Sequence, residues 1–394
     1  MRAIVGARIE TITNGSIETG TVLIDNDGRI VAVGKQVKLP EGVERIDATG
    51  SWLLPGFIDA HNHSGIYEEG LGEPGGDDNE MTDPITPQLR AIDAVNPADE
   101  GLRDALRGGV TSVYITPGSG NVIGGQGSVL RTHGRTVEEM LLREFAGLKA
   151  AFGENPKRVY GQKKQMPMTR MGSAWLLRNA FTQAQLYLQK VERAGEDPEK
   201  RPDRDLKMEA LGRVLRGEVP LRCHAHRADD IRTALRIRDE FGYRMVVDHG
   251  MEAHLLIDEL LERDIPVAWG PGITARIKVE LRGKTLRTPG LLAKAGVKVA
   301  IMTDHPVIPV DTIRLCAGLA VSEGMEESEA LRALTLTPAE ICGVADRVGS
   351  IEVGKEADLV LWDGHPFDWR SHVQTVLLQG KPVYERDHDG DRRG

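Results

Sequence analysis

The sequence predicts an α/β protein, a (β/α)8 TIM-like barrel with a small β-sandwich domain formed by both termini. Three observations carry this prediction. Short apolar runs alternate with amphipathic stretches through the middle of the chain, which is typical of parallel strands joined by crossover helices. Eight such runs occupy roughly 290 residues, which is enough for one barrel. Strand-like sequence rich in turn residues fills the first and the last fifty residues.

The two ends of the chain are expected to form one composite domain. Asp27-Gly28 stands between two apolar runs, which predicts a β-hairpin near the start. Short strand-like runs separated by Gly and Asp recur over 349–364 and 373–384. The predicted divisions are a β-sandwich domain at 1–52 and 346–394 and a barrel domain at 53–345, with a helical insertion at about 169–216.

The barrel prediction assigns a strand to each apolar run in order. The eight expected strands are 56–61, 110–116, 127–132, 148–153, 219–225, 243–249, 265–270 and 297–304. Helices are expected between them at 97–108, 229–241 and 252–263, with Asn96 as the first cap. The insertion at 169–216 is longer than a crossover requires, and it predicts either a packing or dimer contact or a lid over the active face.

Composition narrows the class of protein. Lys and Arg number 50 and Asp and Glu number 59, so the net charge is −9, which argues against a nucleic-acid partner. No stretch of about 18 apolar residues predicts a membrane span, and the start shows no secretory signal pattern. Three scattered cysteines favour a reducing cytoplasm. We expect a cytoplasmic enzyme with a small-molecule substrate, and the long insertion favours a homo-oligomer.

Histidines follow the first predicted strand as His61-Asn62-His63. Residues i and i+2 of a strand point to the same side, so both imidazoles can reach one metal ion. Barrel enzymes place their catalytic groups at this end of the strands. The sequence therefore predicts a metal site at the carboxyl mouth of the barrel.

Further His and Asp residues end three later predicted strands. They are His224-Ala225-His226 after the fifth strand, Asp248-His249 after the sixth and Asp304 after the eighth. All of these ends lie on one face of a barrel. Imidazole and carboxylate ligands suit a divalent ion, with zinc expected first and manganese, iron and cobalt as alternatives.

With these residues in place, the chain resembles the amidohydrolase superfamily of metal-dependent hydrolases, and most of all its imidazolonepropionase-related branch. The resemblance begins at 46–63 (IDATGSWLLPGFIDAHNH) and ends at 336–364, which is similar to the family's exit from the barrel. It implies that Asp304 contacts metal and takes a proton from the attacking water. The implied metal ligands are His61, His63, His224, His249 and Asp304.

Members of the family with two ions need a bridging anion, either a carboxylated lysine or a glutamate at the fourth strand. Glu154 ends the fourth predicted strand and is expected to be this bridge. Lys149 lies inside the apolar run, and we expect it to be too early along the strand to reach the mouth. Lys157 lies beyond the end of the run. A carboxylated lysine, a single-ion site and a surface position for Glu154 are the alternatives.

Other polar residues are assigned by their place along the chain. The residues expected to contact substrate are His226, Asn121, Arg170 and Arg227, with metal ligation as the alternative for His226. The histidines expected on the surface or on helices are His254, His365, His372 and His388.

The predicted function is metal-dependent hydrolysis of a C–N bond in an amide, a cyclic amide or a dipeptide-like substrate. One or two divalent ions would activate hydroxide, and Asp304 would serve as the proton shuttle. Deamination on the same scaffold is the first alternative, and the absence of His-x-x-Glu after the fifth strand favours hydrolysis. A non-enzymatic scaffold is the second alternative, and the complete ligand set argues against it.

Overall fold

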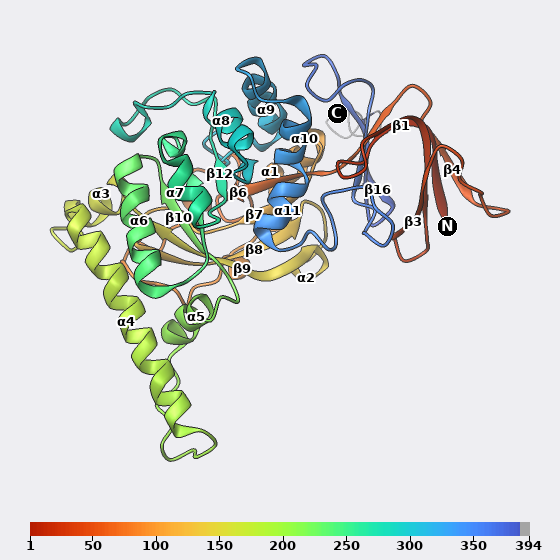
Figure 1. Cartoon of the computed structure of the whole chain (residues 1–394). Helices are drawn as coiled ribbons and strands as arrows, with labels where there is room; N and C mark the ends of the chain where they lie inside the picture. The colour runs from red at the N-terminus through yellow and green to blue at the C-terminus, as the bar shows by residue number, and fades with distance from the viewer. Residues whose placement is uncertain (387–394) are drawn as a thin grey trace.

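The computed structural model describes residues 1–386, so His388 and the end of the predicted 346–394 segment lie outside the described residues. Two eight-stranded sheets dominate this part of the chain (Figure 1). Helices surround one sheet, and the other lies at its side with the N-terminus. Within residues 1–386, no helix combines the length and the apolar character that crossing a membrane requires.

The sheet at the side is built from both ends of the chain. Its strands are β1 (Arg2–Glu10), β2 (Ser16–Ile24), β3 (Ile30–Gly34), β4 (Glu44–Asp47), β5 (Trp52–Pro55), β14 (Leu359–Trp362), β15 (Val373–Leu378) and β16 (Lys381–Glu385). Their order is β16-β15-β14-β5-β1-β2-β3, and β4 pairs with β1. Ile4, Leu53 and Leu359 pack in its core, so early and late residues share one apolar cluster. Its folding into a β-sandwich stays a prediction.

The helix-covered sheet is a nearly closed barrel of eight strands, in agreement with the predicted number. In chain order the strands are β6 (Phe57–Asn62), β7 (Val110–Ile115), β8 (Ile123–Arg131), β9 (Leu141–Ala151), β10 (Leu221–Ala225), β11 (Met245–His249), β12 (Val267–Trp269) and β13 (Val299–Ile301). Every residue of β6, β7, β10 and β11 is buried, as expected of strands covered on both faces.

The third strand corrects the expectation of eight uniform strand–helix units. β8 runs antiparallel to both β7 and β9. Only residues 116–122 connect β7 to β8, and a parallel crossover needs a dozen residues or more. One short helix, α2 (Val137–Met140), then joins β8 to β9. These short connections turn the chain back on itself at the third strand.

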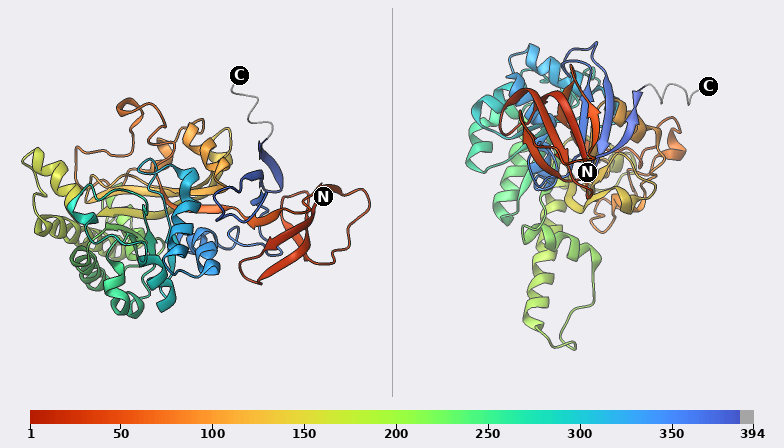
Figure 2. Two further views of the ribbon diagram at one scale, coloured as in Figure 1. Left: turned by 90° about the horizontal axis from the view of Figure 1, so that it is seen from above. Right: turned by 90° about the vertical axis from the view of Figure 1, so that its right-hand side faces the viewer.

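Helices fill the remaining connections. They are α1 (Glu100–Arg107), α3 (Glu154–Gln162), α4 (Arg170–Ala194), α5 (Leu206–Leu215), α6 (Ala228–Phe241), α7 (Ile257–Glu262), α8 (Thr288–Ala295), α9 (Ile313–Ser322), α10 (Glu327–Leu334) and α11 (Leu336–Cys342). The 3-10 helices are η1 (Glu73–Gly75), η2 (Ala91–Asp93), η3 (Ala253–Leu256), η4 (Val279–Leu281) and η5 (Val310–Thr312). In Figures 1 and 2, α4 and α5 project from the barrel as an arm.

Two predicted helices differ in their bounds. The helix expected at 97–108 begins at Glu100, and Asp99 caps it by accepting a hydrogen bond from the Gly101 backbone N–H. Asn96, the expected cap, instead accepts from the Ala98 N–H in the turn before the helix. The helix expected at 252–263 is divided into η3 and α7.

The barrel closes between its first and last strands through residues just beyond them. The Asp304 N–H donates to the His61 carbonyl over 3.1 Å, and the His63 N–H donates to the His305 carbonyl over 3.1 Å. These bonds bring the segment after β13 beside β6. The predicted ligands from the two ends of the sheet therefore meet at one mouth.

Candidate metal centre

The first-strand histidines face Asp304 across the closing seam. The Nε2 atoms of His61 and His63 lie 3.3 and 3.2 Å from Asp304 Oδ1. Their Nδ1 atoms have other partners: His61 Nδ1 lies 3.0 Å from Asp248 Oδ2, and His63 Nδ1 lies 2.7 Å from the Thr116 carbonyl oxygen. Outer partners of this kind fix the ring orientation of metal-binding histidines. Each ring thus turns Nε2 toward the common centre.

The other two predicted histidine ligands are held in a similar way. His249 Nδ1 lies 3.0 Å from the Gly270 carbonyl oxygen, and His224 Nδ1 lies 2.9 Å from Ser119 Oγ. The buried Nε2 of His249 has no hydrogen-bond partner. Both His249 and Asp304 have positive φ, 76° and 56°, an uncommon conformation that clusters at functional sites.

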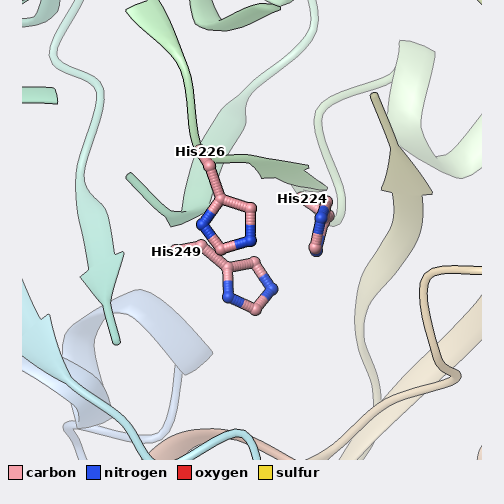
Figure 3. Close-up of side chains that lie close together, drawn as sticks. All are labelled: His224, His226 and His249. Carbon is pink, nitrogen blue, oxygen red and sulfur yellow. The ribbon is translucent and has the colours of Figure 1, made fainter. Parts of the chain in front are cut away.

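The described residues contain two groups of three side chains that could hold a metal ion. One is His61, His249 and Asp304, and the other is His224, His226 and His249. Within each group the ligand atoms lie within 4.8 Å of one another. Figure 3 shows the second group, with the three rings gathered at the ends of β10 and β11. His249 belongs to both groups, so the two positions are adjacent.

Electrostatics favours neutral histidines beside an ionised aspartate. Burial lowers the pKa of His224 and His249 well below the usual histidine range, so both rings are neutral, the form that binds metal. Burial alone would raise the pKa of Asp304, but His249 and hydrogen bonds from His61 and His63 lower it well below its usual range. Asp304 therefore stays a carboxylate.

The side chain of Lys149 on β9 reaches this centre. The sequence interpretation expected Lys149 to lie too early in the fourth strand to reach the barrel mouth. Its side chain is fully buried, and its Nζ lies 3.1 Å from His61 Nε2. Burial lowers the pKa of Lys149 to about 8. The long lysine side chain spans the distance between its backbone inside the strand and the histidines at the mouth.

Glu154, the expected bridge, is the first residue of α3 and lines the cavity at the barrel mouth. Its carboxylate belongs to neither group of candidate ligands. The Glu154 backbone N–H donates to the carboxylate of Glu280, a residue that the sequence interpretation did not single out. The bridging role of Glu154 stays a prediction.

Three of the four predicted substrate residues are engaged by protein partners. Arg170 lies 2.8 Å from Asp230, and Arg227 lies 2.8 Å from Asp229. The buried Asn121 amide donates to the Glu80 carbonyl and to Thr86 and accepts from Tyr160. None of the three is among the residues lining the cavity. Their contact with substrate stays a prediction.

The cavity at the mouth has a volume of about 740 Å³. His63, His224, His226 and Asp304 line it, and so does Arg158, which the sequence interpretation missed. Much of the remaining wall is apolar, and its apolar members include Tyr67, Pro271, Ile277, Val279, Leu281, Pro306 and Val307. Ligand pockets in proteins have this size and this largely apolar character.

Fold and site together define a barrel enzyme with a candidate divalent-metal centre at its mouth. Residues 223–384 match the model of the amidohydrolase family. The crystal structure of an amidohydrolase from Thermotoga maritima is 47% identical, covers 98% of this chain and 100% of that chain, and superposes with a TM-score of 0.95. The chain belongs to the amidohydrolase family, in its imidazolonepropionase-related branch, and the family hydrolyses carbon–nitrogen bonds.

Two curated relatives show how far the similarity extends. The amidohydrolase tasK of Hapsidospora irregularis is 33% identical over 399 residues, which are 93% of this chain. The matched region spans only 40% of that relative's length. An imidazolonepropionase from Mesorhizobium japonicum is 25% identical over 405 residues, covering 91% of this chain and 90% of that protein.

Proposed function

We propose that this protein is a metal-dependent hydrolase of an amide, a cyclic amide or a dipeptide-like substrate. The observation that carries the proposal is the convergence of His61, His63 and Asp304, whose facing atoms lie 3.2 to 3.3 Å apart. Protein groups hold the opposite nitrogen of each ring, as is usual for histidines that bind metal. The carboxyl mouth of a barrel is where such enzymes work.

The residues present fit a divalent ion. The His249 Nε2 atom is buried without a partner and belongs to both candidate groups, and an unpaired buried nitrogen is costly unless something binds it. His61, His249 and Asp304 would hold one ion, with His63 beside them. A bound divalent ion polarises a substrate carbonyl and lowers the pKa of water to about 7. Zinc remains the first expectation.

Lys149 is our preferred bridging residue, in place of Glu154. A neutral lysine amine adds to carbon dioxide and loses a proton, which gives a carbamate with two oxygen ligands. The Lys149 Nζ already lies 3.1 Å from Nε2 of His61, a member of one candidate group, whereas the Glu154 carboxylate is in neither group. The supporting observation is thus the reach of the Lys149 side chain.

Asp304 is the proposed proton shuttle. Its carboxylate lines the cavity and stays ionised, so it can accept a proton from the attacking water. It can then pass that proton to the leaving nitrogen. The backbone hydrogen bond from the Asp304 N–H to the His61 carbonyl holds the aspartate in place for both transfers.

The cavity supports a substrate with an apolar body and an acidic end. Its apolar wall includes Tyr67, Ile277 and Leu281. Arg158 also lines it and has no ion-pair partner within residues 1–386. A guanidinium binds a carboxylate well because its N–H groups match both oxygens.

Metal content and activity test the proposal together. We expect about two divalent ions per chain, and release of amine from a panel of N-acyl amino acids and dipeptides that a chelator abolishes. Lys149→Gln should lower the ion number, while Glu154→Gln should leave it unchanged. Loss of ions in the Glu154 variant alone would return the bridge to Glu154. A metal-free, inactive protein after reconstitution with zinc would contradict the proposed function.

A further inference from the structure

Charge is divided unevenly between two segments that follow strands of the barrel. Residues 155–191, after β9, contain seven basic residues and no Asp or Glu, and we call them the basic segment. Residues 64–89, after β6, contain seven acidic residues and no Lys or Arg, and we call them the acidic segment. The basic residues are Lys157, Arg158, Lys163, Lys164, Arg170, Arg178 and Lys190, and the acidic residues are Glu68, Glu69, Glu73, Asp77, Asp78, Glu80 and Asp83. The basic segment therefore has a charge opposite in sign to the net charge of −9 on the whole chain.

Most of these charges have no opposite partner within the chain. In the basic segment, Arg170 and Arg178 pair with carboxylates over 2.8 and 2.6 Å. The other five cations form no ion pair within the described part of the chain. In the acidic segment, Asp83 pairs with a lysine of α5, and Glu69 lies 3.3 Å from His305. The other five carboxylates likewise form no ion pair among the described residues.

Large apolar side chains are exposed among these charges. The basic segment exposes Met166, Met168, Met171 and Trp175 where the chain enters α4, and each is more than half exposed. The acidic segment exposes Met81. Methionine and tryptophan are enriched at protein–protein interfaces, where their apolar area is removed from water. The combination of unpaired charge and exposed apolar area indicates a contact surface.

The two segments lie side by side. The Lys163 amine of the basic segment donates a hydrogen bond to the Met81 carbonyl of the acidic segment. Both segments also reach the cavity, through Arg158 on one side and Tyr67 and Asp78 on the other. Figure 1 shows α3 and the start of α4 at the end of the barrel away from the terminal sheet. The basic and acidic segments thus form one continuous surface beside the barrel mouth.

A surface with adjacent basic and acidic parts is complementary to a copy of itself. When a two-fold axis passes between the parts, the basic segment of each copy faces the acidic segment of the other, and both contacts are attractive. Charges at physiological ionic strength act over about 8 Å, so these contacts are felt more strongly than the charge of distant surfaces. An anionic membrane or a nucleic acid would attract the basic segment but would be repelled by the acidic segment beside it. A second copy of this chain is therefore the partner that fits.

We infer that the basic and acidic segments form the interface of a two-fold symmetric homodimer. The exposed Met and Trp side chains supply the apolar part of this interface, and the unpaired charges form the contacts around it. Because residues of both segments line the cavity, each copy borders the cavity of its partner. The inference does not depend on the proposed function, since the contacts involve none of the candidate metal ligands.

Charge reversal tests the interface by sedimentation equilibrium of the full-length protein. We expect a species of twice the 43.1 kDa chain mass in the micromolar range, with a dissociation constant that rises with salt. Lys163→Glu with Lys164→Glu, and separately Glu73→Lys with Asp77→Lys, should each weaken self-association by about tenfold or more, because like charges then face each other. None of these four residues lines the cavity. An equal mixture of the two double variants should associate as a heterodimer, because their charges are again complementary.

Trp175→Ala tests the apolar part and should also weaken self-association by about tenfold or more. Trp369→Ala is the matched control, since Trp369 is 74% exposed but lies in the connection between β14 and β15. Lys35→Glu with Lys38→Glu, between β3 and β4, is the control for the change in charge. Both controls should remain dimers. Unfolding curves of every variant establish that each is folded.

A wild type that stays monomeric across the micromolar range would overturn the inference. So would a dimer that both charge reversals leave unchanged, or a mixture of the two double variants that fails to associate. A monomer that binds vesicles of phosphatidylserine and phosphatidylcholine would assign the basic segment to an anionic lipid surface, and would overturn the inference as well. Each of these outcomes leaves the proposed hydrolase intact, because metal content and amine release test it separately.

Discussion

Three of the candidate ligand histidines are each oriented by a particular partner at Nδ1. Asp248 holds His61, and the carbonyl oxygens of Thr116 and Gly270 hold His63 and His249. Two of these partners are backbone atoms, so ring orientation depends on the course of the chain as well as on side chains. Preorganisation of this kind limits the cost of assembling a site around its ion.

Asp304→Asn should lower kcat by about 10²- to 10⁴-fold, because the amide cannot accept a proton from water. Steady-state kinetics on a hydrolysed amide, with ion content measured on the same sample, checks this expectation. If the ions remain and kcat falls, the loss belongs to proton transfer. Asp311→Asn, a change in η5 outside the cavity lining, is the control and should leave kcat unchanged. Wild-type kcat in the Asp304 variant would contradict the shuttle.

Arg158→Gln should raise KM for acidic substrates by about tenfold while changing kcat little, since about 1.4 kcal/mol of binding corresponds to a factor of ten. Comparison of an N-acyl amino acid with its neutral amide isolates the contribution of charge. Lys157→Gln is a neighbouring control that does not line the cavity. An equal rise in KM for both substrates would exclude carboxylate recognition by Arg158.

The candidate site residues at strand ends could be predicted from the sequence. Those that reach the site through a long side chain, or that lie in a connecting segment, were missed. His61 and His63 could be predicted because strand alternation puts both on one face. Lys149 was not predicted because its backbone lies inside the strand, and only the length of its side chain brings Nζ to His61. Glu280 lies in the three-residue η4, which is too short to show periodicity, so nothing in the local sequence distinguishes it from a solvated glutamate.

At the scale of elements, a buried ion pair links three strands behind the centre. Arg222 on β10 donates to Asp248 on β11 over 2.7 Å and to the Ala60 carbonyl of β6 over 2.7 Å. Burial alone would raise the pKa of Asp248, but the charge of Arg222 and the hydrogen bond from His61 lower it below its usual range. The pair therefore connects barrel geometry to the orientation of His61.

Asp248→Asn should destabilise the protein by about 3–5 kcal/mol, because it leaves the buried Arg222 charge without its counter-charge. Denaturant unfolding of the metal-free protein measures the free energy of unfolding without a contribution from bound ion. The double variant Arg222→Met with Asp248→Leu should be more stable than Asp248→Asn, since it removes both charges. Equal stability of wild type and Asp248→Asn would contradict this role.

The order and number of the barrel strands could be predicted from alternating apolar runs, but the direction of β8 could not. The apolar run at 127–132 fits a parallel or an antiparallel strand equally well, because hydrophobic periodicity does not depend on strand direction. Orientation followed from the short connections at 116–122 and at α2. Connection length was thus the more informative feature at this point of the chain.

At the scale of the whole molecule, a buried charge cluster joins the barrel to the terminal sheet. Arg131 at the end of β8 donates to Asp358 over 2.8 Å and also pairs with Glu356. Arg347 lies 2.7 Å from Glu356 on its other side. Burial raises the pKa of Glu356, but hydrogen bonds from Arg347 and the charge of Arg131 outweigh this and lower it.

Glu356→Gln should lower the free energy of unfolding by about 1–3 kcal/mol near pH 7. The folded-state pKa of Glu356 lies below the unfolded value, so its contribution is present above the ordinary glutamate range and is lost as pH falls through the folded pKa. The difference between wild type and variant should therefore shrink on acidification, as unfolding curves across pH will show. The exposed Glu44→Gln, which breaks a surface pair with Arg2, should cost less than about 1 kcal/mol. A difference that grows toward acid pH would contradict this assignment.

The hydrogen bonds that close the barrel have a consequence for its dynamics. The seam between β6 and β13 is closed by the backbones of His61, His63, Asp304 and His305. Three of these residues, His61, His63 and Asp304, are also candidate ligands, so an ion bound between them would hold the first and last strands together. Removal of the ion should then let the barrel open first at the seam between β6 and β13. The amides of His63 and Asp304 should therefore exchange with deuterium sooner than those of β10 and β11.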